Sequence, residues 1–549
     1  MYHRRLQQSG YDLIGDLKTM GYNTLVYLIL FLPAVLLVYQ LVPQRIRKYI
    51  LILAGYVYFY ICSKWLVLYV FGTALFIHHI GMWEDVLKKK CAAEAKGLER
   101  KEQSLIRSRY KRMERILLIF GITVLLGVLG YLKYSNFFEE NLNLLAAAMG
   151  RDPFFVVTKT AVPIGISFYT LQAVGYITDV YWEKQSAEYN LGKLMLFLCF
   201  FPQVMEGPIS LYQQTGEQLW NCRGLTAENL SQGAVRIFWG LFKKLVIADR
   251  LNVLVKVVFD KETDLHGSVV IVAAIAYTIQ LYMEFSGIMD VVAGSGKMFG
   301  IILPENFRQP FFARSAEEFW RRWHISLGVW FKTYIFYPVS ISGPVKKWNR
   351  FAREHKLGRH LTRSVLSAVC LLPVWLANGL WHGPRWSYIF FGIYYFVIIM
   401  AEILVTPLRD KLLEKLGINE NSRGYTAFRI VKTWIIVVVG ELFFRAETLT
   451  RGMQMFASIF VSFDAWALGG AGFEAVELRV VDYIAVLVCT VVVWIVDCLK
   501  EKDRISTEKL ASLKTPVRWA VYYLLIFGVI ILGAYGAGYQ AVDLIYAKF

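Results

Sequence analysis

Long apolar stretches separated by short charged segments dominate the chain. Several are long enough for two passes or a broken helix, and glycine and proline interrupt others. Twelve stretches reach or approach the roughly 20 residues that a helix needs to cross a bilayer, near residues 24–42, 48–80, 116–133, 153–181, 192–205, 233–258, 268–303, 364–381, 387–406, 431–445, 481–499 and 517–539. The pattern predicts an all-α, polytopic membrane protein with roughly 11 to 14 membrane helices.

Composition supports a membrane environment. Hydrophobic residues make up 56% of the 549 positions, which is too many for one soluble core of this size. Charged residues make up 19%, against about 25% in soluble domains, and they gather between the apolar stretches. Membrane lipids are therefore expected to surround the chain.

The excess of positive charge indicates an orientation in the membrane. The formal net charge is +18, but Lys and Arg lie in short segments beside apolar stretches, so no nucleic-acid partner is expected. The segment 84–115, interpreted as a loop, holds eleven Lys and Arg residues and is expected in the cytoplasm. Two further basic segments, 346–363 and 500–518, are expected on the same side.

Metal and nucleotide chemistry find little support in the sequence. The seven cysteines form no Cys-x-x-Cys pair, and no metal-ligand spacing involves either of the two histidines discussed below. Gly294-Ser295-Gly296-Lys297 lacks both the first glycine and the final Ser or Thr of a phosphate-binding loop. No histidine is followed five residues later by the aspartate of glycerolipid acyltransferases. We expect no bound metal or cofactor.

The segment 315–334 differs from the apolar stretches. Ser315 followed by Glu318 predicts a helix start with a capping box. Continued as one helix, the segment has an aromatic face and an opposite face with Arg321, and His324 lies at the edge of the aromatic face. We expect a helix that lies at the interface or enters the membrane only part way.

His382 stands at the end of an apolar stretch and is followed by Gly383 and Pro384, which interrupt helices. An ionisable group at such a position suggests function, although a histidine satisfied by backbone carbonyls is the structural alternative. Its ordinary pKa near 6.5 suits proton transfer from an attacking hydroxyl.

Several short motifs resemble, in order, those of the membrane-bound O-acyltransferase family, and within it the bacterial branch of alginate O-acetylation and teichoic-acid D-alanine transfer proteins. They cover most of residues 150–450. The motifs are PIGISF at 163–168, FPQVMEGP at 201–208, GLFKK at 240–244, EFSG at 284–287 followed by Asp290, LPENF at 303–307, FWRRWHISL at 319–327, WHG at 381–383 and FFRA at 443–446.

The resemblance implies that His382 is the catalytic histidine and His324 the second histidine of this branch. It also implies a ring of helices around a central tunnel, in which a cytoplasmic acyl thioester, acetyl-CoA or another, meets an acceptor from the outer side. Further candidates for substrate or tunnel contacts are Glu284, Ser286, Asp290, Asn306, Arg321, Trp323, Asn378 and Trp381.

The expected organisation is one membrane domain over 1–549. It has N-terminal helices in 1–150, a catalytic core in 150–450 and additional C-terminal helices in 471–549. The expected location is a bacterial inner or plasma membrane, and the expected partner is a separate extracytoplasmic acyltransferase that receives the acyl group for a polysaccharide.

Two other functions remain open. One is D-alanyl transfer to teichoic acid, although the run 471–549 adds helices that this type usually lacks. The other is a glycan transporter or flippase without chemistry of its own. O-acetylation of an extracytoplasmic polysaccharide, such as an alginate-like exopolysaccharide or a cell-wall glycan, is the favoured reading.

Overall fold

The computed structural model describes residues 20–158, 161–260, 266–469, 476 and 478–534. Within them the elements are helices, and one isolated antiparallel bridge joins Phe307 to Trp323. The predicted all-α class is confirmed for these residues. The last part of the predicted C-terminal stretch, 535–549, lies outside the described residues.

Seven helical segments in the described residues are long and apolar enough to cross a membrane: Gln44–Glu94, Arg100–Ala148, Gly267–Met298, Arg359–His382, Trp386–Lys415, Val480–Glu501 and Thr515–Leu532. A multi-pass membrane protein is therefore supported, whereas the count of 11 to 14 stays a prediction. The apolar stretch near 48–80 is broken, because Lys64 adopts φ 51° and a short 3-10 turn separates α4 from α5.

The chain divides into two compact units, and each is described by itself. Of the described residues, the first comprises 20–158, 161–237 and 288–304. Its helical elements are the π-helix η1 (Val26–Phe31), α3 (Leu32–Leu41), α4 (Gln44–Ser63), the 3-10 turn η2 (Lys64–Leu66), α5 (Val67–Glu94), α6 (Arg100–Ala148), α7 (Ile166–Tyr181), α8 (Leu191–Cys199), α9 (Tyr212–Asn221) and most of α10 (Ala227–Leu241).

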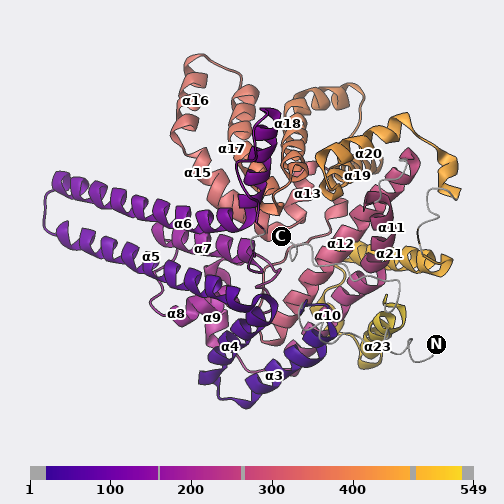
Figure 1. Ribbon diagram of the computed structural model, residues 1–549, viewed down its shortest axis with the longest axis horizontal. Helices are drawn as coiled ribbons and strands as arrows, with labels where there is room; N and C mark the ends of the chain where they lie inside the picture. Colours follow the sequence, from indigo (N-terminus) through magenta and orange to yellow (C-terminus); the bar gives the residue numbers. More distant parts are fainter. Residues whose placement is uncertain (1–19, 159–160, 261–265, 470–475, 477, 535–549) are drawn as a thin grey trace. The chain divides into compact units, whose positions relative to one another are not determined.

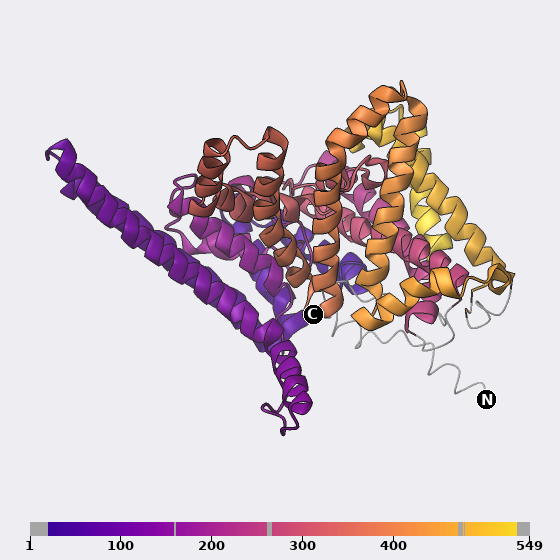
Figure 2. The same ribbon diagram turned by 90° about the horizontal axis from the view of Figure 1, so that it is seen from above.

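The segment 84–115 is not the loop that its charge suggested. Helix α5 continues to Glu94 and α6 begins at Arg100, so that only 95–99 connect them. The two helices run side by side as a long hairpin (Figures 1 and 2). With 49 residues, α6 rises about 74 Å, far more than the roughly 30 Å of a hydrocarbon core. All of the basic residues except Lys96 therefore lie on helices that extend beyond the membrane.

Of the described residues, the second unit comprises 238–260, 266–287, 305–469, 476 and 478–534, and it contains both candidate histidines. Helix α12 (Gly267–Met298) contributes to both units. The other helical elements of the second unit are η3 (Phe242–Ala248), α11 (Asp249–Asp260), η4 (Pro310–Phe312), α13 (Ala316–Arg322), α14 (Ile325–Phe331), η5 (Lys332–Phe336), α15 (Tyr337–Ser340), α16 (Gly343–Glu354), α17 (Arg359–His382), α18 (Trp386–Lys415), α19 (Arg423–Arg445), α20 (Leu449–Val461), η6 (Ala465–Gly469), α21 (Val480–Glu501), α22 (Thr507–Ala511) and α23 (Thr515–Leu532).

Helices α17 and α18 form the hairpin that carries His382. Glycines let their backbones meet: a Cβ atom on Gly379 would lie 2.4 Å from the carbonyl oxygen of Tyr388, and one on Gly392 would lie 2.3 Å from that of Trp375. Helix α18 also packs against α19, and α19 against α20. Main-chain contact therefore fixes the end of α17 against the start of α18.

Candidate active site

His382 is the last residue of α17. Gly383 follows with φ 155° and ψ 174°, a conformation that is essentially restricted to glycine. The helix therefore ends directly after the histidine, as the sequence predicted. The His382 side chain is only 6% exposed.

Aromatic rings surround the His382 imidazole on several sides. The Phe444 ring of α19 meets it edge-on with centroids 4.9 Å apart. The rings of Phe391 and Tyr388, from α18, lie at 5.9 and 6.1 Å. Three helix ends therefore converge on one imidazole.

His324 is not part of a continuous helix, so the single helix predicted over 315–334 is wrong. Helix α13 ends at Arg322, Trp323 is extended, and His324 adopts φ 47° and ψ 50° before α14 begins. Left-handed backbone is uncommon for residues other than glycine and concentrates at functional sites. The break turns the imidazole inward, where the residue is 3% exposed.

Asn306 holds the turn that follows His324. Its carbonyl oxygen accepts a hydrogen bond from Ile325 N at 3.0 Å, and its Oδ1 accepts one from Ser326 N at 3.0 Å. These bonds satisfy amide groups at the start of α14. The predicted candidate Asn306 therefore positions His324 in this structure.

Both histidines contact the ring of one tryptophan, Trp381. The Trp381 centroid lies 5.4 Å from that of His324 and 5.2 Å from that of His382. The sum of these distances, 10.6 Å, is an upper limit for the separation of the two imidazole centroids. Residues 58 positions apart in the sequence are thus brought to one site, where both contact Trp381.

Burial affects the charge of His324, which lies outside the seven candidate spans. Desolvation disfavours the imidazolium and lowers the pKa of His324 to about 3. The side chain is therefore neutral near pH 7. A neutral imidazole can donate one hydrogen bond and accept another.

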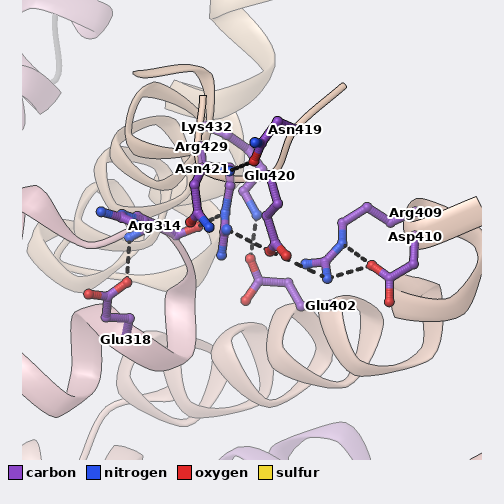
Figure 3. Close-up of polar contacts among 10 residues, drawn as sticks. All are labelled: Arg314, Glu318, Glu402, Arg409, Asp410, Asn419, Glu420, Asn421, Arg429 and Lys432. Carbon is purple, nitrogen blue, oxygen red and sulfur yellow. Dashed lines mark hydrogen bonds and ion pairs between the residues drawn. The ribbon is translucent and has the colours of Figure 1, made fainter. Parts of the chain in front are cut away.

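The start of α13 is tied to neighbouring helices (Figure 3). Ser315 Oγ accepts a hydrogen bond from Glu318 N at 3.1 Å, which confirms the predicted helix start. Glu318 Oε2 accepts from Arg314 N at 2.9 Å, and not from Ser315 as a complete capping box requires. Glu402 of α18 accepts from Ala316 N at 3.0 Å.

Charged residues of α18 and α19 and of the segment between them add further contacts near the start of α13. Glu402 also pairs with Lys432, while Arg429 donates to Glu420 at 2.9 Å and to the Arg314 carbonyl oxygen at 3.2 Å (Figure 3). Both partners of each pair lie within the second unit. The helix that precedes His324 is thereby held at its first turn.

Glu284 and Ser286 belong to a buried polar cluster on α12. Ser286 Oγ accepts from Lys243 Nζ at 2.8 Å, and Glu284 lies 3.8 Å from Lys244 Nζ. Lys244 also pairs with Asp249 at 2.6 Å. Phe285, between the two predicted candidates, contacts His324 with centroids 4.9 Å apart, so the cluster adjoins the site through this ring.

The other candidates differ in position. Trp323 packs against Phe285, the ring that contacts His324, and against Phe307, with its centroid 5.0 Å from that of Phe307. Asn378 is buried one turn before His382. Arg321, by contrast, has a side chain that is 65% exposed and pairs with Glu317 at 3.2 Å. Asp290 belongs to the first unit, where it pairs with Arg236 at 3.0 Å.

Two buried polar residues near His382 were missed. Glu441 lies one turn before the end of α19 and Tyr395 lies in α18, and both are almost completely buried. Glu441 interrupts the apolar stretch 431–445, and an ionisable residue within such a stretch is itself a signal of function.

Comparison with known proteins identifies the family of the chain. Residues 23–352 match the family MBOAT, the membrane-bound O-acyltransferase family. His324 lies within this match and His382 lies beyond it.

Curated relatives cover more of the chain. It is 33% identical over 449 residues to a protein of Pseudomonas aeruginosa named "Probable alginate O-acetylase AlgI", with 82% of this chain and 76% of that protein covered. It is 28% identical to the peptidoglycan O-acetyltransferase of Helicobacter pylori, over 62% of this chain and 64% of the relative. It is also 28% identical to the teichoic acid D-alanyltransferase of Bacillus subtilis, over 52% and 69%. The chain therefore belongs to the membrane-bound O-acyltransferase family and is an O-acyltransferase.

Proposed function

We propose that this chain passes an acetyl group from a cytoplasmic thioester, acetyl-CoA or a similar donor, to a hydroxyl on the outer side of a bacterial plasma membrane, for O-acetylation of a polysaccharide. The observation that carries the proposal is the pair of buried imidazoles on Trp381, one of them at the very end of a membrane helix. The relatives named for alginate and peptidoglycan O-acetylation support the choice of acetyl and glycan.

The charge distribution supports the proposed direction of transfer. Helix α17 begins at Arg359, beside the basic segment 346–363 that the positive-inside rule assigns to the cytoplasm. Its 24 residues rise about 36 Å, roughly a membrane thickness, before they reach His382. His382 is then nearer the outer side, where the acceptor arrives.

In the proposed mechanism one proton moves from the acceptor hydroxyl to His382 and then to the leaving thiolate. His382 accepts the proton of the acceptor hydroxyl while the hydroxyl oxygen attacks the thioester carbonyl carbon. The carbon–sulfur bond then breaks, and His382 returns the proton to the departing thiolate. Neutral His324 donates a hydrogen bond to the carbonyl oxygen as negative charge develops there. We further propose that a separate extracytoplasmic acyltransferase takes the acetyl group onward to the polysaccharide.

The test is the release of ester-linked acids from surface glycans by mild base. Cells carrying the wild-type chain, no chain or His382→Ala are compared, with immunoblots to match the amount of protein in the membrane. Acetate is expected to fall to the level of cells without the chain in the His382→Ala strain. Full acetate with His382→Ala would contradict the catalytic assignment.

The same assay separates the alternatives. Loss of D-alanine instead of acetate supports D-alanyl transfer, which the similarity to teichoic acid D-alanyltransferases makes the second candidate. Retention of the glycan modification after loss of both histidines supports a transporter without chemistry.

A further inference from the structure

Glu441 is a buried carboxyl group that the proposed mechanism does not use. It is 2% exposed, and its Oε2 atom has no hydrogen-bond partner among the described residues. Burial of a polar group without a partner is unfavourable. Such an atom indicates a missing ligand when other unsatisfied groups lie beside it.

Tyr395 supplies a second unsatisfied group next to Glu441. Its hydroxyl is buried and also has no partner among the described residues. A Cβ atom on Gly440 would lie only 2.6 Å from this hydroxyl oxygen, so the glycine that precedes Glu441 leaves room for it. Stacking on Trp375, with centroids 5.4 Å apart, holds the tyrosine ring in place.

Both groups lie one helical turn from side chains that touch His382. Phe444 follows Glu441 by three positions and contacts the imidazole at 4.9 Å. Phe391 precedes Tyr395 by four positions and contacts it at 5.9 Å. Residues three and four apart share a helix face, so Glu441 and Tyr395 lie on the faces that α19 and α18 turn toward the histidine.

Asn378 adds a third group from α17. It lies four positions before His382, is buried, and its Oδ1 atom has no partner among the described residues. The unsatisfied atoms are thus a carboxyl oxygen, a phenol hydroxyl and an amide oxygen. They can accept from and donate to a neutral hydroxyl, whereas none of them is a cation that would attract the phosphates of a donor thioester.

We infer that Glu441, Tyr395 and Asn378 form the subsite that binds the hydroxyl-bearing acceptor beside His382. The inference rests on the proposed function and adds to it the residues that recognise the acceptor. Glu441 and Tyr395 are binding residues in this assignment, and His382 remains the base.

The test exploits the energetic cost of an unsatisfied buried group. Replacing such a group by an apolar one of similar shape is neutral or stabilising, so a residue kept for binding should show lower activity without lower stability. The variants are Glu441→Met and Tyr395→Phe. The matched control is Glu84→Met, because Glu84 in α5 of the first unit is equally buried and neither carboxyl oxygen has a hydrogen-bond partner among the described residues.

Two measurements are made on the full-length chain: glycan acetate in cells and the melting temperature of the purified protein. For Glu441→Met and Tyr395→Phe we expect at least a tenfold loss of acetate with a melting temperature equal to or above that of the wild type. Glu84→Met should keep its acetate.

Three outcomes would overturn the inference. Full acetate in both site variants shows that the acceptor does not need these groups. Acetate and melting temperature falling together shows a structural role. Absence of any difference between wild type, His382→Ala and no chain removes the proposed function itself, which separates that failure from failure of the subsite.

Discussion

At the scale of single residues, His324 combines an unusual backbone with a buried imidazole. Its pKa lies at about 3 in the folded protein, against 6.5 for an ordinary histidine. Between these values the unfolded chain binds more protons than the folded chain, so stability rises with pH through this window. Protonation of His324 therefore opposes folding as the pH falls.

This sign gives a testable pH dependence. The melting temperature of the wild type should fall when the pH is lowered from 7.5 to 5, and the fall should be smaller in His324→Gln, which cannot be protonated. The measurement is thermal unfolding of the purified protein at the two pH values. An equal fall in both proteins would show that other groups govern the acid sensitivity.

The sequence located the two histidines but not how each is held. His382 was identified because the residues beside it, Gly383 and Pro384, reveal a helix end directly in the sequence. The break at His324 was missed because Asn306, distant in the sequence, satisfies the amides of the next helix and so permits a left-handed residue. Tertiary contacts of this kind override local periodicity.

At the scale of elements, the approach of α17 to α18 determines where His382 lies. Gly379→Ala would place a methyl group 2.4 Å from the Tyr388 carbonyl oxygen, so the helices must separate. We expect a loss of roughly 1–3 kcal/mol in stability and a loss of glycan acetate. The control is Gly424→Ala in the first turn of α19, where nothing lies within 4 Å.

The two glycine variants should change the melting temperature in different directions. Alanine is a better helix former than glycine, so Gly424→Ala should leave the melting temperature equal or higher. Equal stability and acetylation in Gly379→Ala would show that α17 and α18 can shift without moving the histidine.

The ends of α5 and α6 could not be located from the charge pattern alone. The eleven basic residues of 84–115 were assigned to a loop because charge is costly inside a bilayer. The structure instead continues α5 and α6 through ten of them and leaves only Lys96 in the connection. Hydropathy indicates where the membrane ends, whereas propensity and the partner helix decide where the helix ends.

At the scale of the whole molecule, the orientation in the membrane is the testable property. A cysteine placed at Lys96, between α5 and α6, should react with a membrane-impermeant maleimide only after the cells are permeabilised. One placed at Arg385, after α17, should react in intact cells. The opposite pattern would reverse the proposed direction of transfer, and cells carrying the wild-type chain control for its seven native cysteines.

The glycine contacts between α17 and α18 also bear on how this enzyme can evolve. Where two helices meet through side chains, each substitution at the interface moves the backbones. Here the contact at Gly379 and Gly392 is made with main-chain carbonyl groups, whose shape no mutation of their own residues alters. Exposed side chains of both helices can therefore change as lipid composition or acceptor changes, while the His382 imidazole keeps its place.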